Sequence, residues 1–190
     1  MAILILIWSP LYSSKNPLVT IDSELGKIVI EIYLQKASIT ANNFLKYVKK
    51  GLYDNTVFHR TVRMDNQHSD KVKIEVIQAL GASWKDNFDP IKHETTKETL
   101  ILHKDGVVSM ARDAPGSARS SFFICINDQP ELDFGGKRNP DGQGFAAFGK
   151  VIKGMDIVKK IQNSTAKGQT LIPTIKINKI YINKKKQNRG

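Results

Sequence analysis

A short stretch of the chain combines residue types that can bind a peptide group beside an apolar surface. Thr56–Val62 (TVFHRTV) has the composition of a strand, and in a strand Phe58 and Arg60 share one face while His59 points to the other. A guanidinium stays charged and donates up to five hydrogen bonds. The stretch can therefore present Arg60 to a cleft with Phe58 beside its stem, although a surface ion pair is the ordinary role of a single arginine.

A second stretch can place an amide beside an apolar side chain. In Lys73–Ala79 (KIEVIQA), Val76 and Gln78 share one strand face. An amide both donates and accepts hydrogen bonds, so Gln78 can bind the backbone of a peptide. The polar segment Arg63–Lys73 contains many turn formers, and we expect a surface loop there that leads into a strand over Val72–Gln78.

The stretch Val107–Asp128 (VVSMARDAPGSARSSFFICIND) predicts two strands joined by an exposed loop. Its apolar ends, VVSMA and SFFICI, have the composition of strands, and the segment between them is rich in Ala, Pro, Gly and Ser. Phe122 and Phe123 point to opposite faces of the second strand, so one of them can line a pocket. These features predict a ledge of peptide size with one aromatic wall.

Other reactive residue types show no pattern of a site. Cys125 is the only cysteine and lies inside the second of these strands, so we expect a small core residue and not a nucleophile. His93 and His103 stand apart from each other and from acidic partners in the sequence, and we assign them no chemistry. Because no Cys/His cluster has the spacing of zinc ligands, we expect no metal and no other cofactor.

Taken together, these stretches resemble a cyclophilin-type peptidyl-prolyl cis-trans isomerase of the bacterial kind. The resemblance rests on SMARDAPGSARSSFFICIND, on Phe58-His59-Arg60 upstream, and on Phe148-Gly149-Lys150-Val151 with Gly154-Met155 downstream. It covers roughly Leu18–Tyr181, with the motifs in the order of the family. It implies an enzyme that accelerates rotation about X-Pro bonds in client proteins and so assists protein folding.

The resemblance also implies a set of site residues. The arginine of the Phe-His-Arg motif is the family's catalytic one, which points to Arg60, and Gln78 matches the family's active-site glutamine. The substrate-binding residues implied are Phe58, His59, Val76, Ala111, Arg112, Asp113, Ser121, Phe123, Leu132 and Phe145. Among them, Ala111 to Asp113 aligns with a segment that pairs with the substrate backbone, and Phe123 aligns with the aromatic base of the proline pocket.

Several positions depart from the pattern of the family. Ala79-Leu80 replaces the usual two glycines, Glu75 replaces a larger apolar residue and makes the expected pocket shallower or more polar, and Ser121 replaces a glutamine. Glu131 stands where many cyclosporin-binding members have a tryptophan, so we expect weak cyclosporin binding. These departures keep an alternative open, which is a cyclophilin-like module of weak catalytic power that binds proline-containing or acidic chains.

The strands that must position these residues follow a period of two. Leu18–Asp22 and Lys27–Leu34 predict a hairpin, and Thr174–Ile182 predicts a strand that closes an edge. Many strands with two helices well apart in sequence favour a mainly β fold. The family resemblance implies a closed antiparallel β-barrel of about eight strands capped by two α-helices, a shape that removes exposed sheet edges.

Apolar residues at helical spacing predict those two helices. The first is expected at about Thr40–Lys50, with Thr40 as its cap and Gly51 as its stop. The second is expected at Met155–Gln162, starting just after Gly154.

Composition limits the number of domains and the kinds of partner. A chain of 190 residues with 41% hydrophobic residues suits one well-buried core, so we expect one domain over residues 18–183, acting as a monomer. A net charge of +11 favours acidic partners, but no nucleic-acid motif or pattern of surface aromatics accompanies it, so we do not expect nucleic acid. The partners implied by the resemblance are proline-containing polypeptide clients.

The two ends of the chain differ from the domain between them. Residues 1–17 contain a continuous apolar run, Ala2–Trp8, which is too short to span a membrane. The run is typical either of the later part of a signal peptide, which predicts a periplasmic or exported protein, or of an apolar arm on a cytoplasmic one. Residues 184–190 are expected to form a solvated basic tail.

Overall fold

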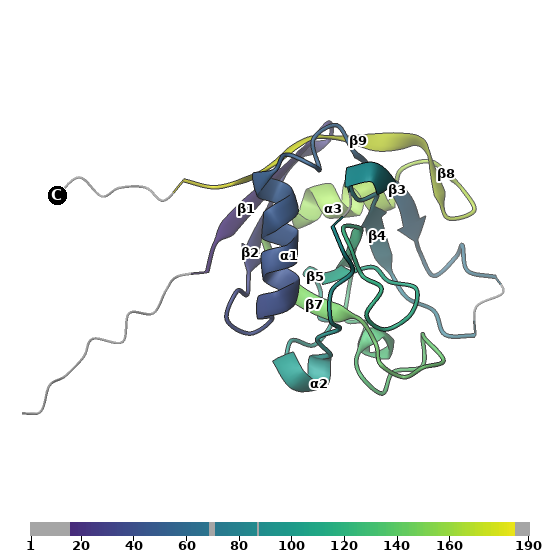
Figure 1. Cartoon of the computed structure of the whole chain (residues 1–190). Coiled ribbons are helices and arrows are strands. Elements are labelled where there is room, and N and C mark those ends of the chain that lie inside the picture. The colour runs from purple at the N-terminus through teal and green to yellow at the C-terminus, as the bar shows by residue number, and fades with distance from the viewer. Residues whose placement is uncertain (1–15, 69–70, 87, 185–190) are drawn as a thin grey trace, which may run out of the picture.

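The structure is a computed structural model that describes residues 16–68, 71–86 and 88–184. Within them the chain forms one closed antiparallel β-barrel (Figure 1). Its strands are β1 (Leu18–Ser23), β2 (Gly26–Ile32), β3 (Val57–Val62), β4 (Val76–Ala79), β5 (Val107–Met110), β6 (Phe122–Cys125), β7 (Ala146–Lys153), β8 (Ala166–Lys167) and β9 (Thr170–Ile182). They are arranged in the order β1-β2-β7-β5-β6-β4-β3-β9, and β1 pairs with β9 to close the sheet, which confirms the predicted barrel.

Alternating apolar residues explain why this sheet folds around a core. In β2, Ile28, Ile30 and Ile32 point inward and are fully buried, whereas Val29 and Glu31 between them are half-buried on the outer face. β1 pairs with β2 in the predicted hairpin. Because the sheet closes on itself, its long strands present no unpaired edge.

Aromatic rings fill part of the barrel interior. Phe44 lies 5.0 to 5.4 Å, between ring centroids, from Tyr53, Phe122 and Phe148, and all four side chains are fully buried. Such aromatic pairs each add about 0.5–1.5 kcal/mol beyond the burial of their area. Phe44 belongs to the first helix, so these contacts anchor that helix to β6 and β7.

Three α-helices lie outside the sheet in the described part of the chain (Figure 1). α1 (Ser38–Lys49) packs on β7 and β9, and α3 (Met155–Gln162) packs on β2, β3 and β4. Both were predicted. The short α2 (Thr96–Thr99) was not, because its single turn carries no helical period.

The start of α1 differs from the prediction. Thr40 lies inside the helix and does not cap it, because the carboxylate of Glu94 takes that role. The backbone N–H groups of Ile39 and Thr40 donate to Glu94 at 3.1 and 2.7 Å, and Thr40 Oγ1 donates at 2.6 Å. A carboxylate here also complements the helix dipole. Gly51, with φ +67°, follows the helix as predicted.

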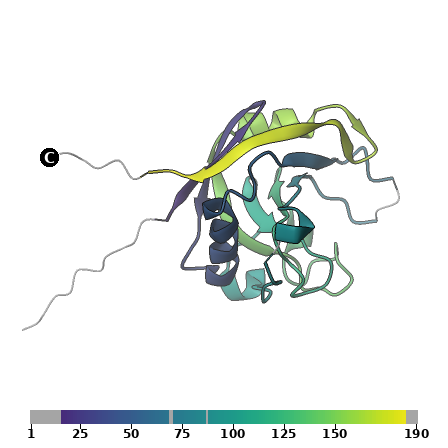
Figure 2. The same ribbon diagram turned by 45° about the horizontal axis from the view of Figure 1, so that its top comes forward.

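Both ends of the described chain leave the barrel on the same side, and the loops after β3 and after β6 lie on the opposite side (Figures 1 and 2). Asn183 N donates to Leu18 O at 2.8 Å, which joins the two ends. The apolar run Ala2–Trp8 and the basic tail from residue 185 lie outside the described residues, so the proposed domain boundaries stay predictions. No helix in the described residues is both long and apolar enough to cross a membrane.

Candidate active site

Two hollows in the surface meet beside β3 and β4. The smaller one, which we call the apolar pocket, has a volume of about 210 Å³, and the larger one, which we call the groove, has a volume of about 840 Å³. Arg60, Gln78, Ala111 and Arg112 line both hollows, so the two form one continuous cleft. The cleft therefore contains both polar residues that the sequence predicted to be catalytic.

A β-bulge in β3 sets the direction of the Arg60 side chain. The register against β4 shifts between Phe58 and Arg60, which leaves His59 as the extra residue. Phe58 consequently points into the barrel, where it is fully buried with its ring 6.4 Å from that of Phe122, and Arg60 points into the cleft. The prediction that Phe58 and Arg60 share a face is wrong, because the bulge interrupts the alternation of the strand. Phe58 belongs to the barrel core and does not line the apolar pocket.

Two amide oxygens hold the Arg60 guanidinium. Its Nη1 donates to Gln78 Oε1 at 3.0 Å, while Nε and Nη2 donate to Gln169 Oε1 at 2.9 and 2.5 Å. Because both acceptors are uncharged, these contacts orient the guanidinium without neutralising it. The group is therefore held as a charged donor where the apolar pocket meets the groove.

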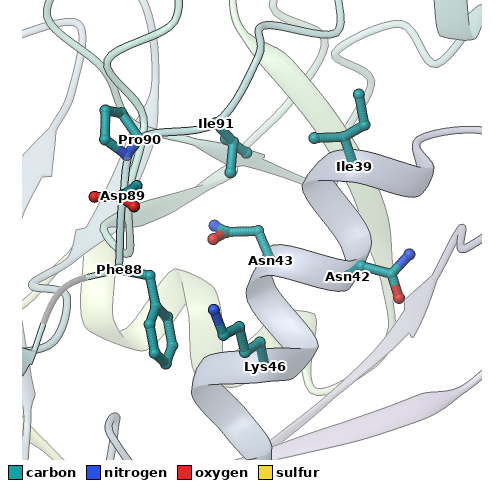
Figure 3. A pocket seen from close by; sticks show the side chains of 8 residues that line it. All are labelled: Ile39, Asn42, Asn43, Lys46, Phe88, Asp89, Pro90 and Ile91. Atoms are coloured by element: carbon teal, nitrogen blue, oxygen red, sulfur yellow. The ribbon is translucent and has the colours of Figure 1, made fainter.

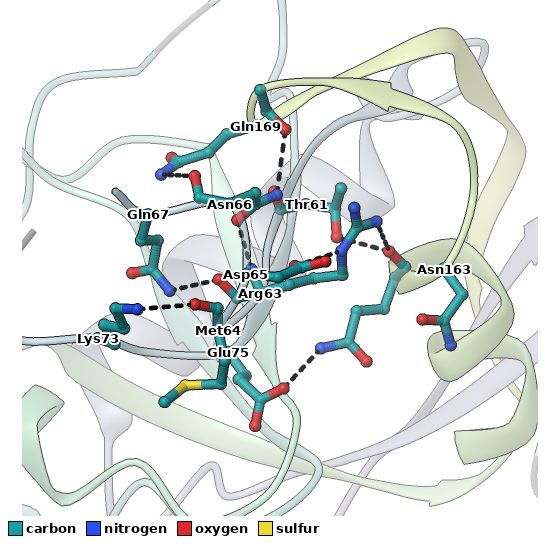
Figure 4. A network of polar contacts seen from close by, with 12 residues as sticks. Thr61, Arg63, Met64, Asp65, Asn66, Gln67, Lys73, Glu75, Asn163 and Gln169 are labelled. Carbon is teal, nitrogen blue, oxygen red and sulfur yellow. Dashed lines mark hydrogen bonds and ion pairs between the residues drawn. The ribbon is translucent and has the colours of Figure 1, made fainter. Parts of the chain in front are cut away.

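Gln169 is absent from the predicted site residues. It follows Gly168 in the turn between β8 and β9, 109 residues beyond Arg60, and no sequence pattern connects the two. Its backbone O accepts from Thr61 N at 2.9 Å, and its Nε2 donates to Asn66 O at 3.4 Å. Asn66 Nδ2 in turn donates to the backbone O atoms of Thr61 and Gly168 at 3.0 and 3.1 Å (Figure 4). The loop after β3 thus fixes the turn that carries Gln169.

The apolar pocket has an aromatic floor. Val76, Phe123 and Leu132 are at most 5% exposed and form part of a small apolar cluster separate from the barrel core. The ring of Phe145 meets that of Phe123 edge-on, at 5.2 Å and 87°. Phe122 points into the barrel and Phe123 into the pocket, which confirms that the two residues of β6 face opposite ways.

The remaining wall of the pocket differs from expectation at Glu75. Its carboxylate accepts hydrogen bonds from Asn127 Nδ2 at 2.8 Å and from Gln162 Nε2 at 3.3 Å, and Glu75 does not line the pocket. Its neighbours Ile74 and Val76 both line the pocket, so Glu75 does not contribute the polar wall that was expected at its position. The strand itself begins only at Val76, later than predicted.

Two residues of the loop after β6 also line the pocket and were not predicted. Arg138 Nη1 donates to Val72 O at 2.6 Å, and Asn139 follows it on the rim. Glycines are frequent in this loop, and such a composition gives no information on the path of the backbone.

Arg112 forms the wall between the pocket and the groove. Its Nε and Nη2 donate to Gly144 O at 2.8 and 2.6 Å, and its Nη1 and Nη2 pair with the two carboxylate oxygens of Asp141 at 2.8 and 2.9 Å. The hydrogen bonds from Arg112 lower the pKa of Asp141 to about 2. Only 1% of the Arg112 side chain is exposed. Its hydrogen bonds join its own loop to the loop that carries Asp141 and Gly144, and the side chain closes one side of the cleft.

The other residues predicted near the substrate backbone line the groove. Ala111 N donates to Ser121 O at 2.9 Å, and Ser121 Oγ accepts from Gly81 N at 3.1 Å. Asp113 is exposed on the groove's rim. Leu80, in place of the second family glycine, keeps the chain on β3 by donating its N–H to Val57 O at 2.9 Å. The backbone at Ala79-Leu80, where the family usually has two glycines, therefore continues the sheet.

His103 has partners that the sequence did not indicate. Its Nδ1 lies 2.7 Å from Asp133 Oδ1 and its Nε2 lies 2.9 Å from Ser109 Oγ. This Asp-His-Ser arrangement resembles a nucleophilic triad. However, Ser109 is 0% and His103 is 1% exposed, so no substrate can reach the Ser109 hydroxyl. The imidazole instead stacks beneath Phe123 at 6.1 Å and 16°, which supports the pocket floor.

His59 lies beside Arg60 but lines neither hollow. Burial and then the Arg60 charge lower its pKa below the ordinary value of 6.5. Its Nδ1 is buried and has no hydrogen-bond partner among the described residues. The fold therefore favours the neutral imidazole, and the predicted contact of His59 with substrate has no support in the geometry of the cleft.

This depressed pKa predicts a dependence of stability on pH. The unfolded chain takes up the proton near pH 6.5 and the folded chain only at lower pH, so the free energy of unfolding should fall as the pH is lowered from 7 towards 5. We expect His59→Gln to flatten this part of the profile, measured by urea unfolding at each pH. An unchanged slope in His59→Gln would assign the effect to another group.

A third hollow, of about 590 Å³, lies between α1 and residues 88–91 (Figure 3). Its charged residues are Lys46 and Asp89, and the Lys46 ammonium lies 3.5 Å from the centroid of the Phe88 ring. None of the described residues that line it is an arginine or a histidine or carries a hydroxyl group, so these residues offer no catalytic set comparable to that of the cleft.

Metal and thiol chemistry have no centre in the described residues. They contain no group of three or more His, Cys, Asp and Glu side chains that could hold a metal ion. Cys125 is buried, as predicted, and burial raises the pKa of its thiol well above the usual range.

Comparison with known families gives a match over most of the chain. The family model for cyclophilin type peptidyl-prolyl cis-trans isomerases matches residues 18–182. The chain is 38% identical over 149 residues to a peptidyl-prolyl cis-trans isomerase of Acinetobacter baylyi, which covers 78% of this chain and 73% of that protein. It is 35% identical over 146 residues to peptidyl-prolyl cis-trans isomerase B of Escherichia coli, covering 76% and 84%.

Solved structures show the same fold. The crystal structure of a cyclophilin type peptidyl-prolyl cis-trans isomerase of Cryptosporidium parvum superposes with a TM-score of 0.68 at 23% identity, covering 90% of this chain and 99% of that one. At this identity the likeness supports the barrel alone.

Proposed function

Because the chain belongs to the cyclophilin-type peptidyl-prolyl cis-trans isomerases and acts on proline-containing peptides, we propose that Arg60 and Gln78 are its catalytic residues and that the apolar pocket holds the proline ring. The comparisons do not favour the alternative of a weakly catalytic binding module. One observation carries the residue assignment, which is the charged Arg60 donor held at the edge of a small apolar pocket.

Catalysis of this rotation requires little more than selective binding of the transition state. Amide resonance keeps the X-Pro bond planar, with a barrier of about 18–20 kcal/mol, and no atom is transferred when the bond rotates. In the twisted state the prolyl nitrogen loses its conjugation and becomes pyramidal. A catalyst must therefore bind this twisted amide more tightly than either planar form.

Arg60 can supply that selectivity. A hydrogen bond from its guanidinium to the prolyl nitrogen forms only when the nitrogen lone pair is released from resonance, so it stabilises the twisted state alone. Gln78 holds the guanidinium through Oε1, and its amide N–H groups can donate to a substrate carbonyl. Because both groups are held before substrate arrives, little reorganisation opposes the reaction.

The apolar pocket supports this chemistry in two ways. Val76, Phe123, Leu132 and Phe145 provide an apolar slot whose volume of about 210 Å³ suits a single small ring. Exclusion of water from the slot also strengthens the hydrogen bond from Arg60. Ala111, Arg112 and Ser121 line the cleft on either side, where the backbone flanking the proline would lie.

We further propose that the protein acts as a monomer on folding polypeptides. The strands of the barrel are closed by the β1–β9 pairing, so the described sheet offers no long edge for a second chain.

The function is tested by NMR exchange between the cis and trans resonances of a short proline peptide. Uncatalysed exchange takes about 10–100 s at 25 °C. We expect micromolar protein to shorten this time to below a second. Exchange that stays at the uncatalysed rate would contradict the activity.

Gln169 is expected to act as a positioning residue. Gln169→Ala removes the acceptor of the Arg60 Nε and Nη2 donors, while Gln78 still holds the guanidinium, so we expect kcat to fall about threefold to tenfold, the net scale of one ordinary hydrogen bond, with KM nearly unchanged. Gln169→Glu should also lower kcat, because a carboxylate partially neutralises the guanidinium. The exposed neighbour Thr170 gives the control, since Thr170→Ala should retain kcat. A loss confined to KM in both Gln169 variants would contradict this role.

A further inference from the structure

We propose that the cleft prefers client chains that carry an acidic side chain within two or three residues of the proline. This inference depends on the site proposed above, since it takes the proline ring to lie in the apolar pocket. Among the described residues, the charged ones that line the two hollows are four arginines and one aspartate, namely Arg60, Arg112, Arg119, Arg138 and Asp113. The cleft thus has an excess of positive charge.

The shape of the cleft brings the residues that flank the proline of a client close to these positive charges. The groove and the apolar pocket share Arg60, Gln78, Ala111 and Arg112, so a chain whose proline occupies the pocket continues along the groove. An extended chain advances about 3.3 Å per residue, which places a side chain two or three residues away about 7–10 Å from the proline.

Arg119 is the cation best placed to meet such a side chain. It is exposed on the groove, and its Nη1 donates to the uncharged Phe88 O at 2.5 Å. Its backbone is fixed, since its O accepts from Asn43 Nδ2 and the O of the next residue, Ser120, accepts from Tyr53 OH at 2.7 Å. Because its backbone is held in place and its charge is exposed, Arg119 can attract a carboxylate at a fixed position on the groove.

The other charges on the cleft modify this attraction without reversing it. Arg112 is paired with Asp141, so much of its charge is balanced. The two amide oxygens that accept hydrogen bonds from Arg60 are uncharged. Asp113 is exposed on the rim of the groove, and its negative charge weakens the attraction that Arg119 exerts on an acidic side chain. The sum still favours an anionic neighbour over a cationic one.

The test uses two series of six-residue peptides with one Ala-Pro bond, in which Glu, Gln or Lys stands two residues before or two residues after the proline. We expect kcat/KM from NMR exchange in 10 mM salt to be about threefold or more higher for Glu than for Gln, and lowest for Lys, in at least one series. The preference should shrink at 0.5 M salt, because screening shortens the range of the field.

Two variants that each remove one positive charge separate a local effect from an overall one. Arg119→Gln should bring the Glu/Gln ratio close to one, whereas Lys179→Gln, on the exposed face of β9, should leave it unchanged. An equal loss of preference in both variants would overturn the inference, because the net charge would then be its cause.

The inference and the proposed function fail in different ways. Equal turnover of the Glu, Gln and Lys peptides in both series would overturn the charge preference and leave the isomerase site intact. No turnover of any peptide, the neutral Gln peptides included, would overturn both.

Discussion

Replacement of Arg60 by alanine is expected to lower kcat/KM for a proline peptide by about ten- to thousandfold. This is the range for loss of one preorganised donor from an active site. The side chain is held in the cleft by Gln78 and Gln169 and is not part of the barrel core, so thermal unfolding of Arg60→Ala should resemble that of the wild type. Single-temperature NMR exchange at several peptide concentrations would give kcat/KM.

Two further variants test whether the loss is specific to the guanidinium of Arg60. Arg60→Lys keeps the charge but cannot reproduce the planar fork that contacts both amide oxygens, so we expect most of the loss to remain. Arg63→Ala removes a nearby arginine that lines neither hollow and should retain activity within about threefold. Turnover by Arg60→Ala that matches the wild type would exclude the proposed donor.

Replacement of Phe58 by alanine is expected to cost about 3–5 kcal/mol in the free energy of unfolding. The ring is fully buried in the barrel core against Phe122 and is absent from the cleft. The assignment of Phe58 to the core and not to the pocket can therefore be tested directly, because replacing a core residue lowers stability whereas replacing a pocket residue lowers turnover. Urea unfolding measures the first, and kcat/KM per folded molecule measures the second.

A milder variant keeps this test informative if Phe58→Ala does not fold. Phe58→Leu should cost about 1–2 kcal/mol and leave kcat/KM of the folded protein nearly unchanged. Phe123→Leu is the matched change on the pocket floor, where we expect a larger loss in kcat/KM than in stability. A tenfold loss of kcat/KM in Phe58→Leu at unchanged stability would return Phe58 to the substrate pocket.

Local patterns predicted the elements of this fold well. The period of α3 placed a helix at Met155–Gln162, and the alternation of β2 placed the hairpin that begins the barrel. These signals are strong because each element buries one face, so its own residues carry the period. Family resemblance supplied the closure of the strands into a barrel, which depends on pairings distant in sequence.

The features missed from the sequence depend on contacts between distant segments or on local irregularity. The bulge at His59 changes the direction of Phe58, and strand alternation alone cannot indicate it. Glu94 caps α1 from a loop 54 or more residues away, and Gln169 reaches Arg60 from a turn 109 residues away. His103 meets Asp133 only once the barrel has formed. Each depends on tertiary packing, so single-sequence patterns could not reveal it.

The long strand β9 has a practical consequence for handling the protein. Its first residue pairs with Arg60 and its last with Val19, so it spans the barrel from the cleft to the side where both ends of the described chain emerge. Thirteen residues at about 3.3 Å each correspond to roughly 40 Å. A biotin tag, fluorescent reporter or sensor surface attached beside Leu18 or Ile182 should therefore leave the cleft facing outward and open to large unfolded chains.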